Sequence, residues 1–216
     1  MFSKISDNII MKALEWAYEK AISQSLPGVE SAFSLASSYQ KTAGNLEQKI
    51  DSLIRWQNAK AVAVGFGSGL GGIIAVPISI PANIAVVLFV QVRMISAIAH
   101  MNGYDLQDER VKTMIFACMY GSGVEEVLKS LNLNYDPNFK NIILQKVTKE
   151  TIVKINNAVK IRMFSRFGTL GPISFGKAVP LLGAFVGGAY DGFCTNAIGT
   201  NAKKLFLKKM SLSGNT

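Results

Sequence analysis

The sequence predicts an all-α protein of about seven to nine helices, with a glycine-rich apolar helical hairpin at its centre. Three observations favour this class. Apolar residues recur at helical spacing along most of the chain, residues 61–92 carry no charged side chain, and no segment offers a partner to an isolated β-strand. With 216 residues and 49% hydrophobic composition, the chain is long enough to bury a core.

The first part of the chain, residues 1–44, is predicted to form amphipathic helices that precede the main helical domain at 45–212. Apolar residues between 7 and 23 repeat at intervals of three and four, as on one face of a helix. Charged residues interrupt them, so this stretch is not expected to be a secretory signal. Pro27 is followed by glycine and predicts a turn, after which a second short helix reaches about Thr42.

A third helix is predicted from residue 45 to about 64, and it leads into the uncharged run. That run exceeds the roughly 20 apolar residues that a membrane-spanning helix needs. Glycines crowd its first half, however, and Pro77 and Pro81 break its middle. The pattern therefore predicts two apolar helices, the second running from about Pro81 to Met101 and ending at Gly103 as a left-handed C-cap.

Beyond the hairpin, Asp105 is expected to cap a helix over residues 106–120. A short helix should follow at 124–131 and a long one at 138–166. Alternate apolar positions in the last segment would also suit a strand, but helix is preferred because the chain offers no partner strand. A second uncharged stretch at 178–190 repeats the four-residue glycine spacing, which would let it pack closely against the first.

Two blocks of sequence share their motifs, order and spacing with a known family. PISIPANIAVVLFVQVRMISAIAHMNGYDLQDE holds a proline-containing apolar turn, a helix with a central arginine and a closing Gly-Tyr-Asp, and FGKAVPLLGAFVGGAYDGF holds a Lys-x-x-Pro-x-x-Gly-Ala-x-x-Gly-Gly pattern. The corresponding positions are Pro81, Asn83, Arg93, Gly103, Tyr104, Asp105, Lys177, Pro180, Gly183, Gly187 and Asp191. From about residue 45 to 208, the chain resembles the EcsC family of bacterial proteins.

The chain departs from the family pattern at two positions. Asn83 stands where aspartate is expected, and Asp191 stands where asparagine is expected. A linked exchange predicts that these two side chains are neighbours. The family is named for a protein associated with an ABC-transporter system, and the resemblance brings no catalytic residues, so it implies more about fold than about function.

The net charge of +9 is unevenly distributed along the chain. Residues 1–111 hold nine basic and nine acidic side chains, so the whole excess follows Val111. Residues 138–166 alone hold seven basic side chains and one acidic one. Such asymmetry predicts an anionic partner. The apolar composition favours a membrane over nucleic acid, for which no recognised module is present; a basic surface without a partner is the alternative.

The candidate contacts to anionic lipid or a protein partner are cations that border the apolar segments: Arg93, Lys177, Lys203, Lys204, Lys208 and Lys209. Arg93 ends the uncharged run and could extend to phosphate headgroups. A salt bridge to Asp105, Asp108 or another acid is the alternative. The lysines near the C-terminus belong to the closing segment 201–212, where Leu205, Phe206 and Met210 are expected to face an apolar surface and the lysines to point outward.

No set of catalytic or metal-binding residues stands out. His100 is the only histidine, and Cys118 and Cys194 lack the spacing of metal ligands, so neither metal nor cofactor is predicted. The two thiols suit a reducing compartment. We therefore expect a non-enzymatic, membrane-associated protein, cytoplasmic or peripheral at the inner face of the membrane, that binds anionic lipid or docks at a membrane transport system. A soluble helical interaction module and a pore-forming or membrane-damaging effector are the alternatives.

Overall fold

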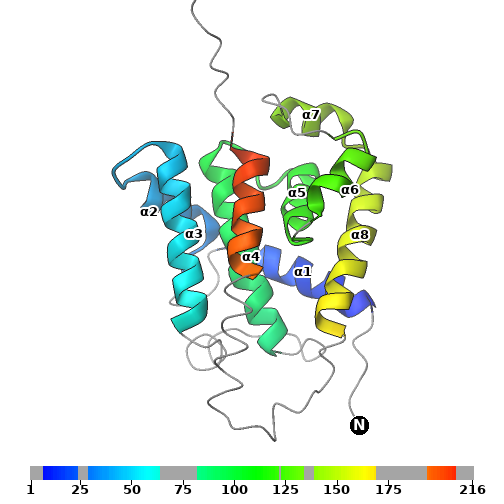
Figure 1. The fold of residues 1–216 in the computed structure, drawn as a ribbon, viewed down its shortest axis with the longest axis horizontal. Coiled ribbons are helices and arrows are strands. Elements are labelled where there is room, and N and C mark those ends of the chain that lie inside the picture. The colour runs from blue at the N-terminus through cyan, green and yellow to red at the C-terminus, as the bar shows by residue number, and fades with distance from the viewer. Residues whose placement is uncertain are drawn as a thin grey trace, which may run out of the picture.

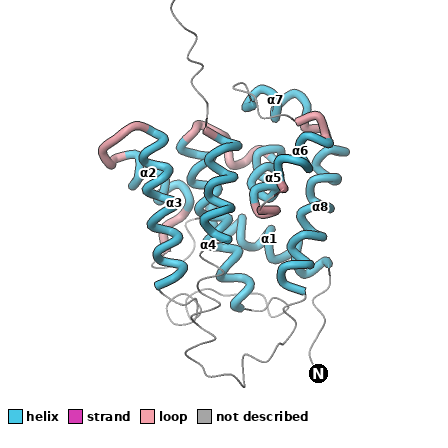
Figure 2. The backbone as a smooth tube through the Cα atoms, viewed as in Figure 1, coloured by secondary structure: helices cyan, strands magenta, loops and turns pink. Residues whose placement is uncertain are grey.

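The fold is all-α, as the sequence predicted. The computed structural model describes residues 7–23, 29–63, 82–121, 123–133, 139–168 and 194–207. Over these residues the chain consists of α-helices joined by turns and loops, with no β-strand among them (Figure 2).

Eight helices are labelled in Figure 1, and one more closes the described chain. They are α1 (Asp7–Ile22), α2 (Ala32–Gln40), α3 (Leu46–Ala63), α4 (Ala82–Met101), α5 (Glu109–Cys118), α6 (Val124–Ser130), α7 (Phe139–Lys146) and α8 (Lys149–Gly168). The remaining helix covers residues 194–206 and is called the C-terminal helix below.

The helix α4 forms the centre of the fold and packs against α1, α2, α3 and α5 (Figure 1). Its residues Ile84–Met101 are apolar and numerous enough to cross a membrane by length and composition, yet 94% of this 18-residue stretch is buried inside the protein. Leu88, Val92 and Ile95 have no exposed surface. The surrounding helices therefore shield α4 from solvent, as they shield the core helix of a globular protein.

The helix α1 lies against α4 along its predicted apolar face. The buried positions follow the helical period and are at most 1% exposed: Ile10, Ala13, Leu14, Ala17 and Ala21. Two aromatic residues extend the contact. Trp16 lies 6.5 Å from Phe89 of α4 between ring centroids, and Tyr18 donates a hydrogen bond to the carbonyl oxygen of Leu106. The N-terminal helix thus covers the core directly.

The C-terminal helix begins beside the middle of α4. The helices α3 and α8 end, and α4 begins, at the lower end of the bundle in Figure 1. Polar side chains join three of these helices: Gln91 Nε2 donates to Thr195 Oγ1 at 3.0 Å, and Arg166 Nη1 donates to Gln91 Oε1 at 3.4 Å. The first arm of the predicted hairpin and its packing against residues 178–190 lie outside the described residues.

The prediction that Asp105 caps the helix after α4 is wrong, because α5 begins at Glu109 with Asp108 as its N-cap. Asp108 Oδ1 accepts a hydrogen bond from Arg110 N at 2.8 Å. Asp105 instead accepts from Gln107 N at 2.9 Å and holds a turn. This turn buries Leu106, which is 2% exposed, before the helix starts. Either aspartate could cap a helix, and burial of Leu106 selects the later one.

The predicted helix at 138–166 is two helices, since the chain breaks at residues 147 and 148. Val147 turns into the core with 6% exposure. Thr148 then opens α8, because its Oγ1 accepts from Thr151 N at 3.3 Å. The choice of helix over strand is confirmed. The buried residues of α8 are spaced by four, at Ile155, Val159, Met163 and Phe167.

The predicted C-cap at Gly103 is also confirmed. Its φ is +75°, a left-handed value that favours glycine. Gly103 N donates to His100 O at 2.9 Å, and Tyr104 N donates to Ala99 O at 3.1 Å. This pair of bonds is a Schellman motif, which satisfies the last carbonyl groups of α4.

Replacing Gly103 tests this cap. Gly103→Ala should lower the free energy of unfolding by about 1–2 kcal/mol, the cost of a left-handed conformation for an ordinary residue. A Cβ at this position would meet only Lys140 Nζ, at 3.7 Å, so crowding adds little. Gly103→Asn should cost less, because asparagine adopts the left-handed region more readily. Urea denaturation measures both, and an equal loss would contradict the conformational explanation.

Candidate functional site

The side chain of Arg93 lies inside the protein, with 8% exposure. Its Nη1 donates to Glu30 O at 3.1 Å and its Nη2 donates to Gln57 Oε1 at 3.2 Å. The guanidinium also lies over the ring of Phe89, 5.3 Å from the centroid. Burial lowers the pKa of Arg93, an effect that the charge of Glu30 opposes. Arg93 therefore joins α4 to α3 and to the segment that precedes α2.

The predicted salt bridge from Arg93 to Asp105 or Asp108 is wrong. Asp108 pairs instead with Arg110, whose Nη2 lies 2.5 Å from Asp108 Oδ2. Arg93 forms no ion pair within the described part of the chain. Its two acceptors are a neutral amide and a backbone carbonyl, which lie on the elements that pack beside it. A role in binding headgroups stays a prediction.

Substitutions of Arg93 test its part in holding these elements together. Arg93→Ala leaves Gln57 Oε1 and Glu30 O without this donor and removes two charge-assisted hydrogen bonds. We expect a loss of about 3 kcal/mol in the free energy of unfolding. Arg93→Lys should recover only part of that stability, since an ammonium group lacks the planar fork that reaches both acceptors. Urea denaturation is the measurement, and full stability in Arg93→Lys would contradict the fork geometry.

Lys203 faces α3 and does not point outward as predicted. Its Nζ lies 2.7 Å from Asp51 Oδ1 and 2.9 Å from Glu47 Oε1. Burial opposes protonation of this amine, but the hydrogen bonds and charges of the two acids outweigh it and raise the pKa of Lys203. The neighbouring Lys204 is exposed. The C-terminal helix is therefore fastened to α3 by Lys203.

Lys203 and Lys204 form a matched pair for a test. Lys203→Gln should lower the free energy of unfolding by about 1 kcal/mol, and Lys204→Gln should leave it unchanged. Because the folded-state pKa of Lys203 is raised, its contribution is complete below the pKa of an unfolded lysine, about 10.4, and is lost as the pH rises through the folded value. Urea denaturation at about pH 8 and about pH 11 checks this. A difference that persists undiminished at the higher pH would contradict it.

The predicted apolar side of the C-terminal helix is confirmed at two residues, since Leu205 and Phe206 are 2% and 1% exposed. The other predicted positions lie outside the described residues. They are Pro81, the side chain of Asn83, Lys177, Pro180, Gly183, Gly187, Asp191, Lys208, Lys209 and Met210. The predicted contact between Asn83 and Asp191 lies outside them too.

The Gly-Tyr-Asp sequence at residues 103–105 is placed where three helices meet. Tyr104 is 6% exposed, and its ring stands edge-on to Phe206 of the C-terminal helix with 5.0 Å between centroids. Lys140 of α7 also lies over the Tyr104 ring, with its Nζ 5.5 Å from the ring centroid. Burial raises the pKa of Tyr104 to about 12. In the described structure this sequence builds a turn and a packing contact.

A surface on α8 was missed by sequence reasoning. Three apolar side chains are exposed on it: Val153 by 58%, Ile161 by 65% and Phe164 by 39%. Their spacing of eight and three residues places them on one face of the helix. The sequence did contain the signal for this surface. The apolar positions 155, 159, 163 and 167 form one face of the helix, and these three apolar residues lie on another.

Basic side chains flank this apolar stripe on α8. They are Lys149, Lys154, Lys160 and Arg162, against the single acid Glu150. Lys154 Nζ pairs with Glu150 Oε1 at 2.6 Å, an exposed pair that contributes little stability. Arg162 Nε donates to Tyr120 O at 3.2 Å, so one of the cations is anchored to the turn after α5. These four cations together with Val153, Ile161 and Phe164 are called the basic apolar face below. This face is the candidate functional site.

These features define a class: an all-α protein built around one buried apolar helix, with a basic and partly apolar helix face at its surface. The chain belongs to the EcsC protein family, whose model matches residues 4–210. The resemblance drawn from the two motif blocks is thereby confirmed, and the match includes residues from both predicted units, 1–44 and 45–212. Neither the curated proteins nor the solved structures contain a match to the chain.

Proposed function

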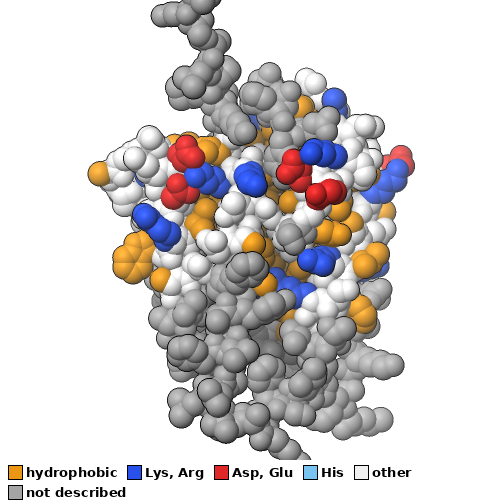
Figure 3. All heavy atoms as spheres, viewed as in Figure 1, with side chains coloured by type: hydrophobic (Ala, Val, Ile, Leu, Met, Phe, Trp, Pro, Cys, Tyr) orange, Lys and Arg blue, Asp and Glu red, His pale blue; other side chains and the backbone are white. Residues whose placement is uncertain are grey.

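We propose that this protein is a non-enzymatic, peripheral membrane protein that binds anionic lipid at the inner face of the membrane. The observation that carries the proposal is the basic apolar face of α8. Hydrophobic and basic side chains lie interspersed on the side of the molecule where α8 lies (Figure 3). Apolar side chains surrounded by cations are the composition of a helix that binds the interface of an anionic bilayer.

The energies of the two kinds of side chain add on such a surface. An exposed aliphatic or aromatic side chain gains about 1.5–3 kcal/mol when it is fully removed from water. Each cation near an anionic leaflet contributes about 1 kcal/mol. The exposed residues Val153, Ile161 and Phe164 therefore favour binding to the interfacial region, and the flanking cations favour anionic over neutral lipid.

The burial of α4 supports peripheral attachment over insertion. The protein itself covers 94% of the stretch Ile84–Met101, so this helix needs no bilayer for its shielding. A pore-forming effector would have to expose α4 and lose those contacts. Docking at a membrane transport system, which the family resemblance suggests, is compatible with the same surface. A soluble interaction module is the alternative that a lack of lipid binding would favour.

Sedimentation with liposomes tests the proposal. The full chain should sediment with vesicles of phosphatidylcholine and phosphatidylglycerol, but not with phosphatidylcholine alone. High salt should release it, because exposed charges more than about 10 Å apart are screened at moderate ionic strength. An alkaline wash should release it as well, since the attachment is peripheral. Sedimentation that survives the wash would contradict the peripheral mode, and a lack of sedimentation with both vesicles would leave the soluble interaction module.

Variants of α8 locate the binding surface. Ile161→Ser with Phe164→Ser should weaken binding to anionic vesicles by about tenfold or more, and Lys154→Gln by about fivefold. The controls are Leu46→Ser and Lys41→Gln, which change an exposed apolar and an exposed basic residue at α2 and α3, away from α8. Equal losses in the controls would contradict the assignment to α8.

A further inference from the structure

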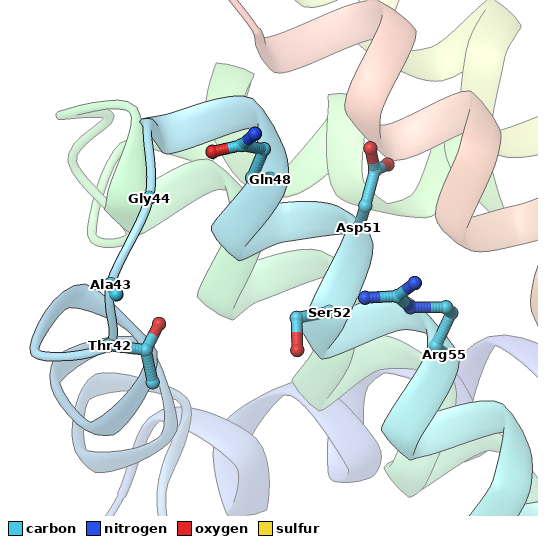
Figure 4. Close-up of a pocket in the computed structure, with 7 residues that line it drawn as sticks. All are labelled: Thr42, Ala43, Gly44, Gln48, Asp51, Ser52 and Arg55. Atoms are coloured by element: carbon cyan, nitrogen blue, oxygen red, sulfur yellow. The ribbon is translucent and has the colours of Figure 1, made fainter.

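A cavity of about 570 Å³ opens between the end of α2 and the outer side of α3 (Figure 4). Its lining is formed by Thr42, Ala43, Gly44, Gln48, Asp51, Ser52 and Arg55. A second cavity of about 420 Å³ adjoins it and is lined by Ser38, Tyr39, Thr42, Ser52 and Trp56. The two share Thr42 and Ser52, so they form one continuous depression.

Three side chains from α3 line the larger cavity, and the amide of Gln48 points away from the other two (Figure 4). Gln48, Ser52 and Arg55 are spaced by four and three residues, which places them on one side of the helix. Gln48 Oε1 accepts from Asn45 N at 2.9 Å, so the amide oxygen is engaged and the NH₂ group remains a donor. The side chains of Ser52 and Arg55 form no hydrogen bond with another described residue. The guanidinium of Arg55 extends toward the side of α3 that faces Thr42 (Figure 4).

Two cations, Arg55 and Lys203, and two acids, Asp51 and Glu47, lie at or beside this cavity, and the acids are drawn to Lys203. The carboxylate of Asp51 points toward the C-terminal helix and away from Arg55 (Figure 4). There it binds Lys203 Nζ at 2.7 Å, beside Glu47. Asp51 and Glu47 thus share Lys203, and Arg55 forms no ion pair with a described acid.

Aromatic side chains border the same depression. Trp56 is 57% exposed and follows Arg55 directly, and Tyr39 lies across from it on α2. Trp16, the other tryptophan, is 8% exposed in the core. Large amphipathic rings at the surface are enriched where proteins meet a membrane interface or a ligand with an apolar part. If the anionic group of a ligand binds Arg55, the rest of the ligand would lie beside Trp56.

We propose that this depression is a phosphate-binding site. Arg55 binds two phosphate oxygens through its planar fork, Ser52 donates a further hydrogen bond, and Trp56 lies beside the group that carries the phosphate. The phosphate comes either from a lipid headgroup or from a soluble phosphomonoester. Only the first of these sources rests on the proposed membrane association.

Trp56 supplies the signal for a test. In the Trp16→Phe variant it is the only tryptophan, and its fluorescence is followed while inorganic phosphate or glycerol 3-phosphate is added. Further arms use vesicles of phosphatidylcholine with and without phosphatidic acid. We expect a saturable change that Arg55→Gln weakens by about tenfold or more. Lys12→Gln, which removes an exposed cation of α1, should leave the affinity unchanged. Circular dichroism verifies that the variants fold, and Trp56→Phe with Trp16 present should abolish the response.

The arms separate the two sources of phosphate. A response to soluble phosphate that Arg55→Gln weakens assigns the site to the phosphate group itself. A response to phosphatidic acid vesicles alone, again weakened by Arg55→Gln, assigns it to a lipid headgroup. No response in any arm, or an equal affinity in Arg55→Gln, overturns the proposal. The α8 variant with Ile161→Ser and Phe164→Ser should weaken vesicle sedimentation and spare the titration with soluble phosphate, so the two proposals fail separately.

Discussion

The burial of α4 is the constraint on which the rest of the structure depends. An apolar stretch such as Ile84–Met101 must be removed from water, and the neighbouring helices do this by packing against it. The polar residues on α4 then need partners inside the core, because a buried polar group without one is costly. Gln91 finds Thr195 and Arg166, and Arg93 finds Gln57 and the carbonyl of Glu30. These bonds fix which elements lie beside α4 as well as the depth at which they pack.

The apolar side chains that stay exposed outside this core are the candidates for binding a partner. Val153, Ile161 and Phe164 on α8 and Trp56 on α3 contribute little to the core that α4 organises. The two surfaces differ in character. On α8, cations surround a stripe of apolar side chains, which suits attraction to an extended anionic surface. Beside Trp56, an arginine without an ion pair to a described acid and a serine hydroxyl line a cavity, which suits a single compact anion. In the proposed arrangement, α8 supplies attachment and the cavity supplies chemical selectivity.

Much of the fold followed from local rules. The period of Ile10, Leu14 and Ala17 predicted α1, and Gly103 after Met101 predicted the end of α4, because each depends on neighbouring residues alone. The errors have a shared cause. Asp105 and Asp108 can both cap a helix, and the break at Val147 carries no proline or glycine; in each place a side chain is buried by contacts from distant parts of the chain. The exposed face of α8 could have been predicted from the sequence, by assigning the apolar positions spaced by four to the core and inspecting the apolar residues that remain. The cavity at Arg55 could not, since Thr42 lies in the turn after α2 and Arg55 lies on α3.

The sequence by itself determined the helical class, the family, the uneven charge and the identity of the central apolar helix, because these depend on composition, periodicity and motif order. Only the tertiary structure decided how individual charges are used. From the sequence, Arg93 and Lys203 are both predicted to be cations beside apolar segments that are available to a partner. In the structure, Arg93 binds neutral acceptors in the core, and Lys203 binds Asp51 and Glu47 on another helix. Arg55 is not singled out by the sequence, and in the structure it forms no ion pair with a described acid, since Asp51 binds Lys203 instead. The energy of a charge depends on neighbours within a few ångströms, and in a helical bundle those neighbours come from residues far apart in the chain.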